Sequence, residues 1–287
     1  MTAPLQTLES PSGIAGQSLA ACGGSASRSK FATIVADPPW QIGDFPANLH
    51  AKGMGVTPCP YPTMTLDEIK ALPVAKLATA EAHLYLWTTA SYLRESYNVA
   101  EAWGFAPMYP LLWCKAPKGR GLGGKFQSNV EFCLFCRNRE GAVRITAAIA
   151  DAAELVGVTR ADIDAALGTS DMGGWLLSRL PHRAKIPTWE QWAKIKALVP
   201  VGDEHDAEIM AAEAERKADN RCNTRWWQWP RAAHSAKPEA FQDVVESVSP
   251  GPYLELFARR QRLGWATWGN EALCHVELVT QNDKGDS

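Results

Sequence analysis

The sequence predicts an open α/β fold into which a helical segment is inserted. Apolar runs rich in β-branched and aromatic residues, typical of buried strands, are separated by segments with helical spacing. Because strands that alternate with helices usually form a parallel sheet with crossover helices, we expect such a sheet. The predicted strands are residues 31–36, 82–88, 108–115, 128–137 and 253–258.

The composition fits a globular protein of one large domain with an insertion. The chain has 287 residues, of which 46% are hydrophobic and 21% charged. The formal net charge is -2, so any nucleic-acid site must come from local basic patches. No apolar run is long enough to cross a membrane. Residues 1–29 are rich in Ser, Gly and Ala and predict a disordered lead rather than a signal peptide.

The cysteines favour a reducing, cytoplasmic environment. There are seven, an odd number scattered along the chain, which does not suggest a disulfide framework. Cys133 and Cys136 form a C-x-x-C motif, but it lies in a predicted strand, where residues three apart point to opposite faces. No second Cys or His pair stands at zinc-finger spacing, so we expect a structural role for these two cysteines and no metal site.

The stretch Asp37-Pro38-Pro39-Trp40 directly follows the first predicted strand. Two prolines fix two consecutive φ angles, remove two backbone donors and leave their carbonyl groups as acceptors. A carboxylate, these acceptors and an indole suit a flat ligand with an amino group, which needs acceptors for its N–H groups and a surface for its ring. A strand followed by a proline turn with a buried Trp is the alternative interpretation.

Capping residues predict where several helices begin and end. Thr65 and Glu68 have the spacing of a capping box. Thr159 and Thr188 are expected to begin two further helices, and Gly168 to end the first of these.

Residues 144–221 predict an inserted helical subdomain that is similar to a helix-turn-helix. An Ala-rich helix is expected at 145–156, and Thr169 or Ser170 is expected to cap a short helix further along. A helical bundle that does not touch DNA is the alternative. The candidate DNA-binding residues in this segment are Arg179, Arg183 and Lys185.

Two further segments carry basic residues and no acidic ones. Residues 115–125 include four glycines and can follow a phosphate backbone, or they form a solvated flexible loop. Residues 221–231 interleave arginines with three indoles, which can hold an unstacked base or form a Trp-rich edge of the core. The candidate nucleic-acid-binding residues are Lys115, Lys118, Arg120, Lys125, Arg225, Trp226, Trp227, Trp229 and Arg231.

Seven short motifs together carry a family resemblance over about residues 31–144 and 222–272. Each is weak alone, but they occur in the family's order. The chain resembles the DPPW-type N6-adenine methyltransferases, relatives of the messenger-RNA adenosine methyltransferase with bacterial and phage members. The motifs are Asp37-Pro-Pro-Trp40, Tyr61-Pro-Thr-Met64, Leu84-Tyr-Leu-Trp87, Trp113-Cys-Lys115, Ser235-Ala-Lys-Pro238, Leu254-Glu-Leu-Phe-Ala-Arg259 and Trp268-Gly-Asn-Glu271.

The resemblance implies a Rossmann-like, S-adenosylmethionine-dependent methyltransferase sheet in permuted motif order. The methyltransferase domain would then comprise residues 30–143 and 222–287, and residues 144–221 would be a target-recognition insertion like the one in phage and bacterial DNA members. The Gly-rich loop that usually follows the cofactor strand of methyltransferases is absent, as it is in this family, so residues 259–262 are expected to shape that wall of the site.

The resemblance also implies roles for individual residues. Asp37 and the Pro38 carbonyl would receive the adenine amino group, with Pro39 completing the turn, and Trp40 would lie against the base. Lys237 would pair with the cofactor's carboxylate. The other residues expected at the cofactor are Asp37, Glu255, Phe257, Arg259, Asn270 and Glu271, the last three holding its ribose and hydroxyl groups.

The leading hypothesis for function is DNA adenine N6-methylation. The cofactor is S-adenosylmethionine, the partner double-stranded DNA, and the target adenine must be flipped out of the duplex. One alternative is methylation of adenosine in RNA. Another is a non-catalytic nucleic-acid-binding regulator on the same fold, against which the intact Asp37 and Lys237 argue. The sequence leaves open the recognition site, the role of the methyl mark and the oligomeric state.

Overall fold

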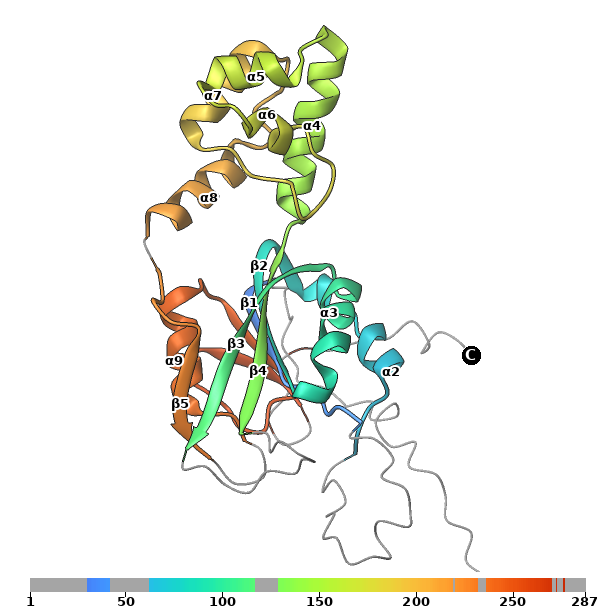
Figure 1. Cartoon of the computed structure of the whole chain (residues 1–287), viewed down its shortest axis with the longest axis vertical. Coiled ribbons are helices and arrows are strands. Elements are labelled where there is room, and N and C mark those ends of the chain that lie inside the picture. The colour runs from blue at the N-terminus through green and yellow to red at the C-terminus, as the bar shows by residue number, and fades with distance from the viewer. Residues whose placement is uncertain are drawn as a thin grey trace, which may run out of the picture.

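A computed structural model of the chain describes residues 30–41, 62–116, 129–218, 220–231, 236–269, 272 and 276. A mixed sheet forms the lower part in Figure 1, and a group of helices lies above it. The elements are β1 (Phe31–Ala36), α2 (Leu66–Ala71), η1 (Val74–Leu77), β2 (Ala78–Thr88), η2 (Ala90–Tyr92), α3 (Leu93–Ala102), β3 (Phe105–Ala116), β4 (Val130–Asn138), α4 (Glu140–Val156), α5 (Arg160–Leu167), α6 (Met172–Leu176), α7 (Trp189–Leu198), α8 (Asp206–Lys217), β5 (Trp226–Pro230), α9 (Glu239–Val248), β6 (Tyr253–Leu256) and β7 (Trp265–Trp268).

The sheet is mixed, so the prediction of a parallel sheet was wrong for one strand. The order of its seven described strands is β5-β3-β4-β2-β1-β6-β7. β1 runs parallel to β2 and β6, whereas β4 is antiparallel to both β2 and β3. No helical pattern separates β3 from β4 in the sequence, and consecutive strands without a crossover helix pair antiparallel.

The two faces of the sheet bury different clusters, and the C-x-x-C motif contributes to both. Cys133 belongs to the cluster that contains Trp87 and Phe241. Cys136 belongs to the cluster on the other face, which contains Trp103. Both cysteines are at most 1% exposed. The predicted structural role is therefore supported: alternation along β4 sends the two thiols into separate cores.

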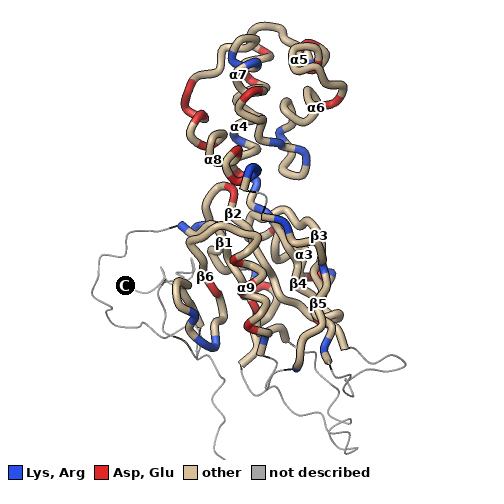
Figure 2. The backbone as a smooth tube through the Cα atoms, turned by 90° about the vertical axis from the view of Figure 1, so that its left-hand side faces the viewer, with Lys and Arg blue, Asp and Glu red and all other residues tan. Residues whose placement is uncertain are grey.

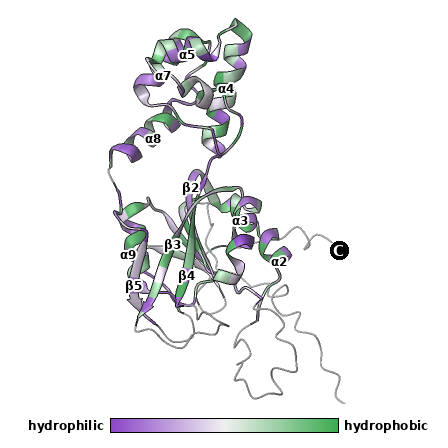
Figure 3. Cartoon of the chain, viewed as in Figure 1, coloured by the Kyte–Doolittle hydropathy of each residue, from purple (hydrophilic) through white to green (hydrophobic). Residues whose placement is uncertain are grey.

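Helices α4 to α8 enclose a hydrophobic cluster of their own, built around Ile149, Ile163 and Trp192. Figure 3 shows hydrophobic residues both along the strands and on these helices. The boundary predicted at residue 144 falls inside α4, which begins at Glu140. The Asn138 side chain accepts the N–H of Glu140, the first residue of the helix, at 2.9 Å.

The predicted capping box of Thr65 and Glu68 is present. Thr159 and Thr188 begin helices as predicted, and each also forms a capping box with the residue three positions further on. The expected cap of α6 by Thr169 or Ser170 is wrong. The Asp164 carboxylate instead accepts the Gly173 N–H at 2.9 Å.

The turn from α5 to α6 is tight. A Cβ on Gly173 would lie 2.4 Å from the Arg160 carbonyl oxygen, so only glycine lets the two helices approach this closely. With five residues, α6 makes little more than one turn.

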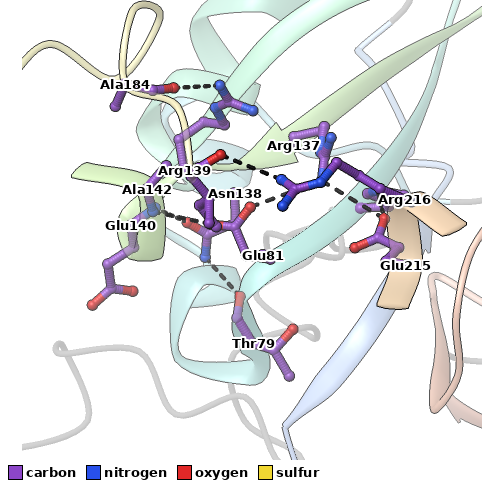
Figure 4. Close-up of polar contacts among 12 residues, drawn as sticks. Thr79, Glu81, Arg137, Asn138, Arg139, Glu140, Ala142, Ala184, Glu215 and Arg216 are labelled. Carbon is purple, nitrogen blue, oxygen red and sulfur yellow. Dashed lines mark hydrogen bonds and ion pairs between the residues drawn. The ribbon is translucent and has the colours of Figure 1, made fainter. Parts of the chain in front are cut away.

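A polar cluster joins the helices to the sheet (Figure 4). Arg137 of β4 lies between Glu81 of β2 and Glu215 of α8, at 3.8 and 3.7 Å. Arg139, directly after β4, donates to the Ala184 carbonyl at 2.5 Å. Burial raises the pKa of Glu81 to about 7 although Arg137 opposes the shift.

This joint lies at the amino end of β1 and β2. In the β2–β4 ladder, Arg137 pairs with His83, whereas Phe132 pairs with Thr88 at the carboxyl end of β2. Because β4 is antiparallel to β2, the chain leaves the sheet for α4 at the end opposite to Asp37. Figure 1 shows the helices at that end.

Candidate functional site

Asp37 lies at the carboxyl edge of the sheet, directly after the central strand β1. In open α/β sheets, ligands bind beyond the carboxyl ends of the strands. A pocket with about 500 Å³ of empty space opens at this edge. Its lining residues are Val35, Asp37, Trp87, Ala236, Lys237, Pro238, Phe241, Gln242, Glu255, Phe257, Arg259 and Arg260. The structure thus brings together five of the predicted catalytic and cofactor residues.

Asp37 is one end of a row of four alternating charges. The Lys237 ammonium donates to Asp37 Oδ2 at 2.7 Å and lies 3.3 Å from Glu131 Oε2. Glu131 also pairs with Lys115. The row therefore links β1, β4 and β3 to the segment before α9, with no net charge among its four members.

The members of this row keep one another charged. Burial would raise the pKa of Glu131, but Lys237 and Lys115 hold it below its ordinary value. Burial opposes the charge of Lys237, yet Asp37 and Glu131 hold its pKa above the ordinary value. Lys237 also lies over the Trp87 ring, 5.4 Å from its centroid.

Glu131 was not among the site residues predicted from the sequence. The available signal was a single acid in an otherwise apolar strand, since a buried carboxylate needs a cation beside it. The row also corrects one prediction, because Lys115 lies in β3 with 17% of its side chain exposed and pairs with Glu131. Held in this way, it is not a free cation for a phosphate.

The proline carbonyl groups already have hydrogen-bond partners. Pro38 accepts the Trp40 N–H at 2.8 Å, and Pro39 accepts the Met64 N–H at 2.9 Å. The expectation of free acceptors is therefore wrong. A carbonyl oxygen has two lone pairs, so Pro38 retains one further acceptor position.

Trp40 is a core residue here. It is 5% exposed, and its indole N–H donates to the Trp87 carbonyl at 3.0 Å. Tyr92 stacks on it with ring centroids 5.3 Å apart, and the Tyr92 hydroxyl donates to the Gln41 carbonyl. Because Tyr92 covers the ring in this conformation, the role of Trp40 against a bound base stays a prediction.

At the carboxyl end of β6, Glu255 adds a second carboxylate to the lining of the pocket. Gln242 of α9 donates to Glu255 Oε2 at 2.6 Å. Burial raises the pKa of Glu255 to about 7, Arg260 opposes the shift and Asp37 adds to it. Phe257 follows with a φ of 62°, a left-handed conformation that is uncommon outside glycine. Such strain concentrates at functional sites.

The arginines after β6 lie in two different places. Arg259 and Arg260 line the pocket. Arg262 instead pairs with Asp243 and Glu246 of α9, at 2.6 and 2.7 Å. The expectation that the whole segment 259–262 shapes the cofactor wall therefore needs this correction.

Close packing explains why glycine occupies position 269 in the last motif. A Cβ there would lie 2.3 Å from the Ala258 carbonyl oxygen. Five predicted site residues fall outside the described part of the chain and stay predictions: Lys118, Arg120, Lys125, Asn270 and Glu271.

The arginine and tryptophan segment forms β5 on the edge of the sheet. Trp227 and Trp229 are partly buried and stack on each other with centroids 5.4 Å apart, so they belong to the core edge. Trp226 is 59% exposed. Arg225 lies over the Tyr109 ring at 3.9 Å, and Arg231 donates to the Asn129 side chain at 2.9 Å.

The predicted DNA-binding residues of the helical part lie far from Asp37. Arg179 pairs with Asp151 at 2.5 Å. Arg183 and Lys185 lie over the Trp175 ring, at 5.6 and 4.2 Å from its centroid. All three are exposed.

The pocket suits the chemistry of S-adenosylmethionine. That molecule carries a carboxylate, an ammonium group, a sulfonium and ribose hydroxyls. Lys237 supplies a cation, Asp37 and Glu255 supply acceptors, and Phe241 supplies an apolar wall. In the described part of the chain no group of three or more His, Cys, Asp or Glu is arranged to hold a metal ion, nor does any described helix have the length and apolar character that crossing a membrane requires.

A central strand followed directly by an acidic residue beside such a pocket, in a sheet with one antiparallel strand, is consistent with a Rossmann-like methyltransferase fold. The family model described as MT-A70 matches residues 31–152. Together with the relatives below, this match supports a likeness to the MT-A70 family of N6-adenine methyltransferases.

Known relatives match different amounts of the chain. The Type II methyltransferase M.MunI of a Mycoplasma species is 22% identical over 89% of this chain and 84% of its own length. A putative N(6)-adenosine-methyltransferase MT-A70-like protein of Medicago truncatula is 33% identical over 88% of this chain but 28% of its own length. Human N(6)-adenine-specific methyltransferase METTL4 is 47% identical over 20% of this chain and 12% of its own length. The chain therefore spans only a minor part of the two eukaryotic relatives.

Proposed function

We propose that the protein transfers a methyl group from S-adenosylmethionine to the N6 atom of an adenine flipped out of double-stranded DNA. The observation that carries the proposal is Asp37, held at 2.7 Å by Lys237 beside an open pocket. Similarity to a Type II methyltransferase over most of both chains supports DNA as the polymer.

The chemical problem is a weak nucleophile. The lone pair of the exocyclic nitrogen of adenine is delocalised into the ring, and it must turn towards the incoming methyl group. We infer that the Asp37 carboxylate accepts one N–H of this amino group and that the second lone pair of the Pro38 carbonyl accepts the other. Bound S-adenosylmethionine would supply the methyl group, its S–CH3 bond breaking as the N6–CH3 bond forms and the thioether product leaving. The Asp37 carboxylate, which accepts an N–H of the same nitrogen, would take up the proton that this nitrogen then loses and pass it to water.

The charge row fixes the geometry for this step. Positive charge grows on the adenine nitrogen as the new bond forms, and the nearby Asp37 carboxylate stabilises it. Lys237 fixes the Asp37 side chain, and Glu131 fixes Lys237 from the other side. An orientation set in advance in this way costs no rearrangement during the reaction.

The base needs a surface that the described conformation does not offer. Tyr92 covers the outer face of Trp40. We infer that Tyr92 either moves aside or itself becomes the stacking surface for the flipped adenine. Replacement of Tyr92 by Ala separates these possibilities: a rise in the KM for DNA supports stacking on Tyr92, whereas an unchanged or lower KM supports its displacement.

The central experiment measures label transfer from S-adenosylmethionine into adenine, with duplex DNA and RNA offered separately. We expect label in DNA, and a loss of about 100-fold or more in kcat for Asp37→Asn, the usual size when one transition-state contact is lost. Asp67→Asn, a change at an exposed acid of α2, is the matched control and should keep full activity.

The same experiment tests the alternatives. Label only in RNA would overturn the choice of polymer and support the second candidate, which rests on the adenosine methyltransferase relatives. No label in either polymer would support a non-catalytic regulator. Equal label with Asp37→Asn would overturn the role proposed for Asp37.

A further inference from the structure

The basic residues of the helical part divide into two groups. Among those described in α4 to α8, six have a carboxylate within 4.0 Å: Arg144, Arg179, Lys194, Lys196, Arg216 and Lys217. Arg160, Arg183 and Lys185 form no ion pair with any described residue, and all three are exposed. Exposed cations without counter-charges are the kind that a polyanion attracts.

These three residues converge on one short helix. Arg183 and Lys185 lie over the ring of Trp175 in α6. The Arg160 guanidinium lies 3.5 Å from where a Cβ on Gly174 would be, so it runs along the same helix. Figure 2 shows Lys and Arg residues gathered beside α6, on the side towards the sheet. Two acids lie beside this helix: the Asp171 carboxylate accepts the Trp175 indole N–H at 3.4 Å, and the Asp164 carboxylate accepts the Gly173 N–H at 2.9 Å and interacts with the charge of Arg160.

The cluster is fixed in position relative to the sheet. Ala184, between the two cations, is fully buried, and its carbonyl accepts from Arg139 at the end of β4. The cations are therefore presented from an anchored segment, and the Trp175 ring limits where they can go. Because these side chains are already held in place, less conformational entropy is lost when they bind a ligand.

We propose that Arg160, Arg183, Lys185 and Trp175 form a phosphate-binding platform for duplex DNA at a distance from the methylated adenine. This inference rests on the proposed function, because it takes the substrate to be DNA. It adds Arg160 and Trp175 to the DNA contacts and removes Arg179, whose charge Asp151 neutralises.

The strand geometry sets the distance. β4 has 9 residues, with Glu131 of the catalytic row near its start and Arg139 just beyond its end. At about 3.3 Å per residue this separation is about 26 Å. The platform lies beyond Arg139, so this length is a lower limit. Because duplex DNA rises about 3.4 Å per base pair, a duplex that runs along β4 would meet the platform at least about eight base pairs from the target adenine.

The first test measures duplex binding at several salt concentrations with the full chain. R183Q/K185Q removes two unpaired cations, and R144Q/K194Q removes two paired ones, so both variants have the same net charge. The slope of log K against log salt should fall by about 2 for R183Q/K185Q and stay near the wild-type value for R144Q/K194Q. R183K/K185R, which keeps the charges, should retain the wild-type slope.

The second test varies the length of duplex on one side of a methylatable adenine. Wild-type methylation should rise at a flank length of about eight base pairs or more, and R183Q/K185Q should lose this dependence. If wild type methylates DNA while both double variants bind alike, the platform is wrong and the proposed function stands; these cations would then suit an acidic protein partner. If wild type binds DNA with the expected slopes but transfers no methyl group, the proposed function fails and the platform stands. No binding of duplex by wild type at low salt overturns the platform.

Discussion

At both the carboxyl end and the amino end of the sheet, carboxylate side chains are buried beside lysine or arginine side chains. The surroundings of these two clusters differ. At the carboxyl end, Asp37, Lys237 and Glu131 alternate along the wall of an open pocket. At the amino end, Glu81, Arg137 and Glu215 lie between the sheet and α8 (Figure 4). The first arrangement can act on a ligand, whereas the second joins two parts of the chain.

The two ends of the sheet also differ in how many cations lie near the buried carboxylate and in how close those cations are. Glu131 has two lysines close to it, and its pKa lies below the ordinary value. Glu81 has Arg137 at 3.8 Å, and burial raises its pKa to about 7. The comparison shows that a buried carboxylate stays charged only where cations outweigh its lost hydration.

The largest expected effect comes from removing the cation at the carboxyl end. Lys237→Met leaves Asp37 and Glu131 without their shared partner and should lower the free energy of unfolding by about 3–5 kcal/mol. Adding Glu131→Gln should recover part of this loss. Urea unfolding measures both. Arg137→Met at the amino end, where the contacts are longer, should cost less; an equal cost would remove the contrast between the two ends.

The next effect tests whether the helical part is a separate unit. Ile163→Ala, at a fully buried position of α5, should lower stability by about 2–5 kcal/mol. Hydrogen exchange should rise in α4 to α7 and stay unchanged in β1 and β2. Ile34→Ala in β1 is the matched control and should give the opposite pattern. Uniform loss of protection in either variant would mean that the two parts unfold together.

A smaller, pH-dependent effect is expected at the joint. Glu81 has a pKa raised to about 7 in the folded state, so the folded protein binds the proton more tightly than the unfolded chain. The penalty is absent near pH 4, develops as the pH rises from about 4.5 to about 7, and reaches roughly 3 kcal/mol above pH 7. Glu81→Gln should therefore stabilise the protein at pH 8 relative to wild type and change little at pH 4.

Unfolding in urea across this pH range provides the measurement. Glu101→Gln, at an exposed acid of α3, is the control and should leave the pH profile as it is in wild type. A profile for Glu81→Gln that parallels wild type would show that the pKa of Glu81 is the same in the folded and the unfolded protein.

The smallest effects come from the helix caps, one in each part. Thr188→Ala and Thr65→Ala each remove a side chain that accepts an N–H of its helix and should each cost about 1 kcal/mol. Serine at either position should restore most of the stability. A cost near zero for Thr188→Ala alone would indicate that packing around Trp192 holds α7 without its cap.

Local sequence signals predicted much of the fold. Alternation along one strand placed Cys133 and Cys136 in opposite cores, and three capping boxes begin helices where expected. Signals that depend on neighbours were less reliable. Thr169 does not cap α6. The carboxylate of Asp164, in the preceding helix, accepts the Gly173 N–H and also accepts the Thr169 hydroxyl.

The candidate site divides in the same way. The order of motifs identified Asp37 and Lys237, which the structure brings into contact. Glu131 and the burial of Trp40 could not be predicted, since both depend on side chains that approach from other strands and helices.

The sequence by itself determined that a strand delivers an acid and two prolines to one point, that the family's motifs follow in order, and that a helical segment interrupts them. The tertiary structure decided where that segment lies. Because β4 runs antiparallel to β2, it carries the chain from the Asp37 end of the sheet to the opposite end before α4 begins. Strand direction depends on which strands pair, and pairing is set by contacts between residues distant in the chain.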